Sequence, residues 1–178
     1  MRERDGRRLR GQQRRQQLIG AALTVLERDG LPGFTHRAVA AEAGVALASA
    51  TYHFKGIDDL AVSAILEATD EFTQAIRDRS DGASLSGYAT ALADELSQHR
   101  GRVIAGYELY LLAARRPALR EAAAFWLRAG TDPLLAGVGE LRRQAFLATV
   151  DSVCIKALLA DSPPKASDIE ERLTHALR

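Results

Sequence analysis

A glycine at position 44 separates two short helical patterns, and this arrangement constrains the chain more than any other feature. Apolar residues recur before it at Ala38, Val39 and Ala43, a spacing that fits about two helical turns. Glycine adopts the left-handed conformation at a helix end without steric cost, so the chain can turn sharply there. Residues 47–53 then predict a second short helix. Two short helices joined by a tight turn indicate a helix-turn-helix, a motif that places its second helix in a DNA groove.

Thr35 is placed to begin the first of these helices. Its hydroxyl can accept a hydrogen bond from an otherwise unpaired N–H of the first turn. His36 and Arg37 follow at the helix N-terminus, where an anionic phosphate is favoured. We therefore predict that Thr35, His36 and Arg37 lie against DNA phosphates, while Val45 turns inward at the corner.

The second helix carries side chains that suit DNA. Leu47, Ala48 and Ser49 lie at its N-terminal end, the part that usually meets base edges. The Ser49 hydroxyl can bond to several bases, and the two apolar side chains can contact a thymine methyl group. Hydrogen-bond donors follow and can bind phosphates: Thr51, Tyr52, His53 and Lys55. The same residues also allow a packing interpretation, in which Tyr52 and Phe54 belong to the core of an Ala-rich helical hairpin.

Basic residues are concentrated near the N-terminus. The net charge is +1, but residues 1–55 hold ten Lys and Arg against five Asp and Glu, so they carry +5 and the remainder carries −4. Most of the excess comes from seven arginines: Arg2, Arg4, Arg7, Arg8, Arg10, Arg14 and Arg15. We expect an arm that makes weak, non-specific contacts with DNA. The other interpretation is a solvated tail without a fixed partner.

Residues of about 15–60 resemble the DNA-binding domain of the TetR family of bacterial one-component regulators. The matching stretches are LIGAALTVLERDG, FTHRAVAAEAGV, the His53-Phe54 pair and Asp58-Asp59-Leu60, with the spacing that the family shows. The resemblance implies a helix-turn-helix domain followed by a variable helical domain whose last two long helices pair across a two-fold axis. The stretch AGYELYLLAARRPALR also resembles one recurrent C-terminal subtype of the family.

The sequence departs from the family at three positions near the recognition helix. Ala46 stands where the family usually has Ser or Thr, so the recognition helix lacks its expected cap. Thr51 replaces a usual Tyr, and Ile57 replaces a usual Lys. Tyr52 and Lys55 are the candidates to supply the missing contacts.

The composition predicts an all-α fold. Aromatic residues make up 6% of the chain, and the alternating runs of Val, Ile and Thr that indicate strands are missing. We expect about nine helices in two domains. Residues 1–57 would form the N-terminal arm and a three-helix DNA-binding domain with the helix-turn-helix, and residues 58–178 a C-terminal helical ligand-binding and dimerisation domain.

Helical spacing predicts the elements on either side of the motif. A first helix is expected from about Gln12 to Asp29, ending at Gly30. Its core face comprises Ile19, Ala22, Leu23 and Leu26. A longer helix begins near Asp58 and carries an apolar stripe of Ala61, Ile65, Ala68, Phe72 and Ile76. Further helices are expected at residues 85–99 and 119–135, the latter kinked or broken by Pro133. A stripe between them comprises Val103, Tyr107, Tyr110, Leu111 and Ala114.

Residues 140–159 are apolar on nearly every side, so a helix here needs two partners. Ser167 is placed to cap a final amphipathic helix, whose apolar residues are Ile169, Leu173 and Leu177. We expect the second partner to be another copy of the chain, which makes residues of about 140–160 and 167–177 the homodimer interface. Such a dimer would read two DNA half-sites about a helical turn apart.

A small-molecule effector is expected in the C-terminal domain, mainly because of the family resemblance. The candidate pocket residues combine apolar area with polar tips: Tyr88, His99, Tyr107, Glu108, Tyr110, Phe125 and Trp126. Ordinary core packing is the alternative for each aromatic residue, and a solvated helix face is the alternative for Glu108. The expected effect of the ligand is to shift the spacing of the two recognition helices.

The remaining motifs argue against an enzyme. The four histidines are scattered without a metal-ligand spacing, and the chain contains no GxSxG, P-loop or GxGxxG pattern. Cys154, the single cysteine, lies in an apolar run that favours an inert thiol. We therefore expect no catalytic site, no metal and no cofactor. The absence of a long apolar segment and of a secretory signal predicts a cytoplasmic protein without a membrane span.

Two other functions remain open from the residues. One is an architectural or non-transcriptional DNA-binding protein whose C-terminal half docks another protein. The other is a small helical ligand-binding or enzymatic protein whose apparent motif is only packing. A repressor of transcription, released from a palindromic operator by an effector, is the function that the sequence favours.

Overall fold

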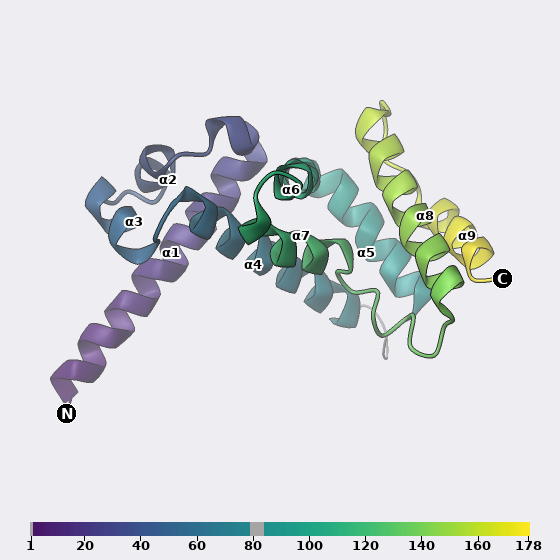
Figure 1. Cartoon of the computed structure of the whole chain (residues 1–178), viewed down its shortest axis with the longest axis horizontal. Helices are drawn as coiled ribbons and strands as arrows, with labels where there is room; N and C mark the ends of the chain where they lie inside the picture. The colour runs from purple at the N-terminus through teal and green to yellow at the C-terminus, as the bar shows by residue number, and fades with distance from the viewer. Residues whose placement is uncertain (1, 79–83) are drawn as a thin grey trace.

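The computed structural model describes residues 2–78 and 84–178, with side chains from residue 9 onward. This part of the chain forms nine α-helices and one 3-10 helix, and it contains no strand (Figure 1), which confirms the predicted all-α fold. The N-terminal helices are α1 (Arg2–Gly33), α2 (His36–Glu42), α3 (Leu47–His53) and α4 (Ile57–Asp78). The others are α5 (Leu85–Gln98), α6 (Arg100–Ala113), η1 (Pro117–Leu119), α7 (Arg120–Leu127), α8 (Glu140–Leu159) and α9 (Ala166–Ala176).

The helices are arranged along one long axis (Figure 1). Helices α1, α2 and α3 form one end, and the N-terminal part of α1 extends beyond the other two. Helix α4 runs from this end toward the middle, where α6 and α7 pack near it, and α5, α8 and α9 form the opposite end. Within the described residues, no helix combines the length and the apolar character that crossing a membrane requires.

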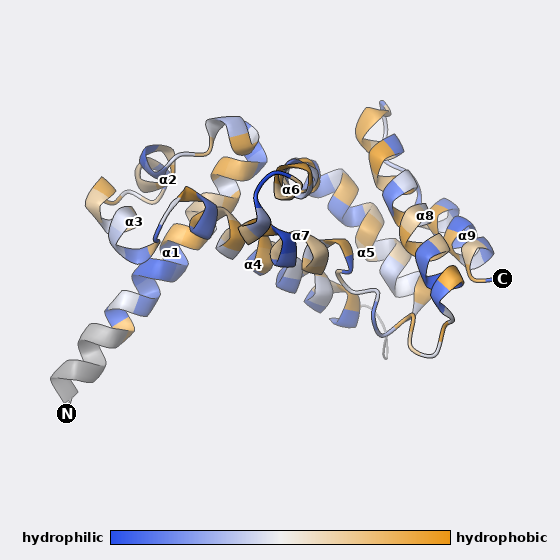
Figure 2. Ribbon diagram, viewed as in Figure 1, coloured by the Kyte–Doolittle hydropathy of each residue, from blue (hydrophilic) through white to orange (hydrophobic). Residues whose placement is uncertain are grey.

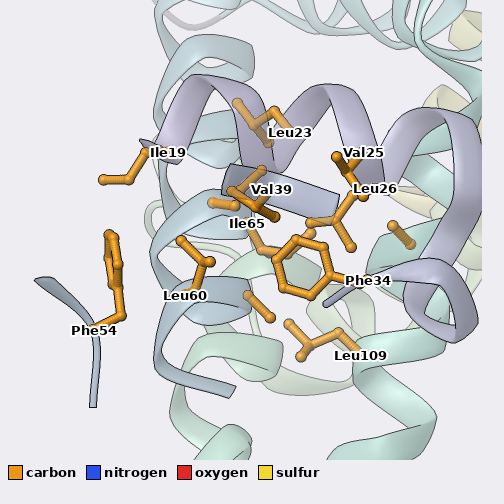
Figure 3. Close-up of a cluster of buried hydrophobic side chains, with 14 of the residues drawn as sticks. Ile19, Leu23, Val25, Leu26, Phe34, Val39, Phe54, Leu60, Ile65 and Leu109 are labelled. Atoms are coloured by element: carbon orange, nitrogen blue, oxygen red, sulfur yellow. The ribbon is translucent and has the colours of Figure 1, made fainter. Parts of the chain in front are cut away.

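A first hydrophobic core holds the helix-turn-helix (Figure 3). Its members include Leu26 of α1, Val39 of α2, Phe54 after α3 and Leu60 of α4, all at most 2% exposed. Leu109 of α6 belongs to the same cluster. The predicted core face of α1, from Ile19 to Leu26, is confirmed. Because α6 contributes to this core, packing is continuous across the predicted domain boundary at residues 57 and 58, and that boundary stays a prediction.

A second core lies at the other end of the molecule. It combines Ile76 at the end of α4, Leu92 of α5, Phe146 of α8, and Ile169 and Leu173 of α9. Helix α8 matches the predicted span of 140–159, and the second core covers the side that carries Phe146.

Helix α1 begins earlier than predicted, at Arg2 instead of Gln12. The added segment, residues 2–11, contains five arginines, and Arg is a strong helix former, so the backbone continues as a helix without an apolar face. Gly30 interrupts α1 with a φ of 64°, as the sequence indicated, and one further turn reaches Gly33.

The predicted apolar stripe of α6 is wrong at three of its five positions. Tyr110, Leu111 and Ala114 are exposed, and the buried side instead carries small residues such as Gly106 and Ala113. The reason is Trp126 of α7, which lies so close that a Cβ at position 106 would come within 2.3 Å of its ring. Small residues at the contact with α7, together with Val103 and Leu109, therefore mark the packed face of this helix.

Two further helix predictions need correction. The expected helix of 119–135 ends as an α-helix at Leu127, and turns follow through Gly130 and Gly137, both with positive φ. The chain is therefore broken before Pro133, not kinked there. Ser167 does not cap α9, because the helix begins after Lys165 and the Ser167 hydroxyl lies 3.2 Å from the Asp168 carboxylate.

Candidate DNA-binding surface and ligand pocket

Helix α3 is fixed through one face and open on the other. Ala50 is fully buried, and Phe54, directly after the helix, is 2% exposed. On the opposite face Tyr52 is 85% exposed and Leu47 is 45% exposed. The packing interpretation is therefore right for Phe54 and wrong for Tyr52. A short helix held in this way keeps its outer side chains accessible to a binding partner.

The turn before α3 is held by several backbone and side-chain bonds. The Ala38 amide donates to the Thr35 hydroxyl at 3.1 Å, which confirms Thr35 as the N-cap of α2. Gly44 has a φ of 63°, and no atom lies near the place of its missing Cβ. The Gln17 side chain of α1 donates to the Ala43 carbonyl at 2.8 Å, so α1 satisfies an acceptor at the end of α2. These bonds orient the turn and hence α3.

The structure brings the candidate DNA-binding residues to one end of the molecule. Seven of them are exposed: Thr35, Arg37, Leu47, Ala48, Thr51, Tyr52 and Lys55. The other three, His36, Ser49 and His53, are partly exposed. The Thr51 hydroxyl donates within its own helix, 3.2 Å from the Ala48 carbonyl, so it must rotate before it can donate to a phosphate. The Lys55 side chain is exposed, while its backbone amide donates to Asp59 at 3.0 Å.

The positions at which the sequence departs from the family have structural consequences. Ala46 is the N-cap of α3 and provides no side-chain hydrogen bond. Ile57 is the first residue of α4 and packs against the first core, so its role is apolar. Lys55, two residues earlier, is left as the exposed cation of this turn.

The arginines of the N-terminal arm divide into two groups. Arg10, Arg14 and Arg15 are described, and Arg15 acts within the fold: its guanidinium lies 5.0 Å from the centre of the Phe54 ring and donates to Ser63 at 3.0 Å. Arg14 donates to Gln17 at 2.9 Å, and Arg10 is exposed. The remaining arginines (Arg2, Arg4, Arg7 and Arg8) lie outside the described side chains, so their predicted contacts with DNA stay predictions.

A cavity opens in the middle of the molecule between α4, α5, α6, α7 and α8. It has about 630 Å³ of empty space, its open mouth included. Four aromatic side chains line it: Phe72, Tyr88, Tyr107 and Trp126. Three charged side chains also reach it: Glu95 of α5, Arg102 of α6 and Asp151 of α8. An apolar cavity with a few polar groups is the usual form of a small-molecule site.

Three of the seven predicted pocket residues, Tyr88, Tyr107 and Trp126, line this cavity. The other four lie elsewhere, and the prediction that they surround the same cavity needs correction. His99 points to Glu27 of α1 at 3.2 Å, and Glu108 accepts a hydrogen bond from the Leu31 amide at 2.7 Å.

Tyr110 and Phe125, the last two of the seven, are about half exposed. The helical period explains the separation on α6, because Tyr107 faces the cavity while neighbouring Glu108 is turned by about 100° toward α1.

The charged lining residues were missed by the sequence reasoning. Glu95 and Asp151 each interrupt an otherwise apolar helix face, and this is the signal that could have identified them. Arg102 donates to Glu27 of α1 and to Glu71 of α4, the latter at 2.6 Å. A single side chain at the cavity wall therefore binds both helices that support the helix-turn-helix.

Burial shifts the protonation of several cavity groups. Loss of solvent raises the pKa of Glu95, although His99 and Arg102 act against this. Loss of solvent also raises the pKa of Asp151, and the Tyr107 hydroxyl, which donates to it at 3.0 Å, opposes the shift. Burial raises the pKa of the Cys154 thiol to about 12, which agrees with the expected inert thiol. Among the described residues, no three His, Cys, Asp or Glu side chains gather in a group that could hold a metal ion.

An exposed recognition helix and an apolar pocket in one all-α chain are typical of DNA-binding regulators that respond to ligands. Comparison with known families agrees. Residues 18–64 match the model of bacterial regulatory proteins of the tetR family, and residues 80–178 match the model of the tetracyclin repressor-like C-terminal domain. The chain belongs to the TetR family, whose members are DNA-binding transcriptional regulators. This membership does not favour the architectural alternative.

Three relatives illustrate the similarity. A TetR-family member from Streptomyces coelicolor A3 is 38% identical, with a TM-score of 0.79 over 93% of this chain and 98% of that one. The multidrug binding protein EbrR, in a complex with ethidium, is 37% identical, with a TM-score of 0.79 over 93% and 99% of the two chains. The nicotine-responsive transcriptional repressor HdnoR of Paenarthrobacter nicotinovorans is 31% identical over 114 residues. That match spans 58% of this chain and just over half (56%) of HdnoR.

Proposed function

We propose that this chain represses transcription as a homodimer that binds a palindromic operator through α3 and leaves it when a small molecule enters the central cavity. The observation that carries the proposal is the outward face of α3, on which Tyr52 and Leu47 are exposed while Ala50 and Phe54 anchor the helix. Side chains held in this way can enter a major groove without unfolding any part of the domain.

The dimer is proposed from α8, along which hydrophobic positions recur (Figure 2) and several apolar side chains are exposed. Leu141 and Leu159 are more than 80% exposed, and Ile155 is 48% exposed. Helix α9 packs Ile169 and Leu173 inward and lies beside α8. A second copy that pairs its α8 and α9 with these helices would remove the exposed apolar surface from water. The same symmetry would present two α3 helices to one face of a duplex.

The response to a ligand is proposed from the cavity and from its relatives. EbrR is described as a multidrug binding protein, and HdnoR as nicotine-responsive. In this chain Arg102 lines the cavity and also binds Glu27 of α1 and Glu71 of α4. A ligand that displaces Arg102 would therefore alter the position of α1, on which α2 packs, and of α4, which shares the first core with α2 and α3. This gives the ligand different affinities for the DNA-binding and the released states.

The proposed function also implies expectations about catalytic activity and about cellular location. We expect no catalytic activity, because the cavity groups serve binding. We also expect the protein to act in the bacterial cytoplasm, where the operator would be.

The test is selection of binding sites from random duplexes, followed by footprinting of the selected sequence. We expect one palindrome with half-sites about a helical turn apart. Tyr52→Ala should weaken operator binding at least tenfold, because Tyr52 is the most exposed large side chain of α3 and contributes little to packing. Tyr110→Ala is the matched control, since it removes an exposed tyrosine from α6 and should leave operator affinity unchanged. Many scattered sites, or equal loss in both variants, would contradict the proposal.

A further inference from the structure

We propose that the central cavity selects a hydrophobic cation, with aromatic side chains around its apolar body and the carboxylates of Glu95 and Asp151 around its charge. The inference deepens the proposed function and rests on it, because it names the chemical class of the ligand. The evidence is the set of aromatic and charged side chains that line the cavity, together with the ring contacts, hydrogen bonds and ion pairs that each of them makes.

The aromatic lining is arranged in two edge-to-face pairs. The rings of Phe72 and Tyr88 have centroids 6.0 Å apart at an angle of 77°, and those of Tyr107 and Trp126 have centroids 4.9 Å apart at 87°. In such a pair the partner covers one ring face with its edge and leaves other faces and edges for a third group. The faces of Trp and Tyr rings attract cations. Tyr88 is 2% exposed and also packs against Phe146, with ring centroids 6.1 Å apart, so Phe72, Tyr107 and Trp126 are the rings left to receive an apolar body that carries positive charge.

Glu95 supplies a charge that no neighbour neutralises directly. Its carboxylate lines the cavity and forms neither a hydrogen bond nor an ion pair within 4.0 Å with the part of the chain that the structure describes. A partly buried carboxylate without a partner is unfavourable, and a cation or a proton can relieve it. The cation would be the ligand.

Asp151 provides a second carboxylate from another helix. It accepts a hydrogen bond from Tyr107 at 3.0 Å through one oxygen, Oδ1. No bond to its other oxygen occurs within the described residues. Tyr107 is also half of an aromatic pair, so this bond joins the carboxylate to the aromatic wall.

Arg102 does not make the cavity suitable for an anion. Its guanidinium is bound by Glu27 and Glu71, so these three groups together carry one negative charge. Glu95 and Asp151 add to that charge when they are ionised. An anionic ligand would meet repulsion, and a neutral ligand would leave both carboxylates desolvated. A cation attracts both carboxylates and so offsets the free-energy cost of their desolvation.

The single tryptophan makes the test direct, because Trp126 lies in the cavity wall. The full-length protein is titrated with three probes of similar size while Trp126 fluorescence is followed. The probes are the benzyltrimethylammonium cation, its uncharged carbon analogue neopentylbenzene and the phenylmethanesulfonate anion. We expect the cation to bind at least tenfold more tightly than the neutral analogue, and the anion to bind most weakly. Equal or tighter binding of either other probe, or no saturation by the cation at millimolar concentration, overturns the inference.

Variants locate the charge recognition. Glu95→Gln and Asp151→Asn should each weaken binding of the cation about tenfold and leave binding of neopentylbenzene unchanged. Glu121→Gln is the matched control, because Glu121 is exposed on α7 and should have no effect. Unfolding midpoints establish that the variants are folded, and an uncharged amide in place of a desolvated carboxylate should not lower them. If both variants bind the cation like the original chain, the inference is wrong.

A pH series gives a second readout. Protonation of Glu95 and Asp151 at low pH should weaken cation binding, and affinity should rise as both ionise. The groups facing them are Glu27, Glu71, His99 and Arg102 around Glu95, and Tyr88, Tyr107 and Cys154 near Asp151. A slope that persists in the variant with both substitutions would contradict the assignment. Operator binding without any probe keeps the two proposals apart: if it is retained while the cation fails, only this inference falls.

Discussion

The helix-turn-helix and the central cavity treat polar groups in opposite ways. At the helix-turn-helix the groups that orient the turn are paired, as in the bonds of Thr35 with Ala38 and of Gln17 with Ala43, and most candidate DNA-binding side chains are exposed. His36 is the exception, because its Nε2 is buried and has no hydrogen bond within the described residues. At the cavity the Glu95 carboxylate has no hydrogen bond within the described residues, although charged side chains lie near it, and the Asp151 carboxylate has one, from Tyr107. One region is therefore preorganised for its partner, while the other keeps an electrostatic cost that a ligand can remove.

Helix α6, together with α1 and α4, forms the junction between these two regions, and it is held by a third kind of contact. Helix α6 packs closely on α1, and Gly101 allows its backbone to approach the backbone carbonyl of Glu27. Arg102 of the same helix joins α1 to α4. The junction thus combines close packing with an ion-pair network, and each of these can be broken separately.

The largest effect is expected when the close packing is broken. A Cβ at position 101 would lie 2.1 Å from the carbonyl oxygen of Glu27, so Gly101→Ala must separate α6 from α1. We expect a loss of about 3 kcal/mol in the free energy of unfolding, measured by denaturant titration. Gly20→Ala is the matched control, because position 20 is an exposed helical site with no atom within 4 Å. It should stabilise the protein by about 0.5–1 kcal/mol. Equal effects would contradict the close contact.

Breaking the ion pairs should have an intermediate effect. Arg102→Gln leaves Glu27 and Glu71 without their guanidinium, and we expect a loss of about 2 kcal/mol in the free energy of unfolding. Arg28→Gln removes a second bridging arginine, which binds Asp29 and Glu42 at the exposed surface. The free energy of unfolding should fall much less in this variant than in Arg102→Gln, because the ion pairs of Arg28 lie in solvent.

The two arginine variants should also differ in function. Operator affinity measured with and without ligand should become equal in Arg102→Gln and should remain different in Arg28→Gln. An Arg102→Gln protein that still releases DNA normally would show that this network does not carry the signal.

The smallest effect is expected when a helix N-cap is removed, and this can be tested at both ends of the molecule. Thr35 caps α2 and Ser84 caps α5, with bonds of 3.1 and 3.0 Å to the amides of Ala38 and Gly87. Replacing either residue with Ala should cost about 1 kcal/mol of stability, measured by denaturant titration. Only Thr35→Ala should also weaken operator binding, because it loosens the start of the motif. A matching loss of operator affinity in Ser84→Ala would remove the distinction between the regions.

Local signals made much of the DNA-binding end predictable. Thr35, Gly44 and the span of α3 follow from a cap residue, a glycine that permits positive φ and a short apolar period. Helix α8 was predictable for a similar reason, since Gly139 and an uninterrupted helical sequence define it. In these cases the residues that decide the structure are neighbours along the chain.

The cavity could be predicted only in part, because contacts between distant segments decide it. The packed face of α6 depends on Trp126, twenty residues beyond Gly106, and no local period reveals that contact. Glu95 and Asp151 are more than fifty residues apart in the sequence and lie on different helices. Sequence patterns identify each as an acidic residue on an amphipathic helix, but only the folded chain brings both to one cavity.

The interruption of α1 at Gly30 has a consequence for how this protein can change over time. Only glycine adopts the local φ of 64° without strain, and a Cβ there would also lie 3.0 Å from the Glu108 carboxylate that accepts the Leu31 amide. A mutation at either position therefore harms the junction unless the other adapts as well. Homologous sequences should inherit Gly30 and Glu108 as a pair, or lose both together.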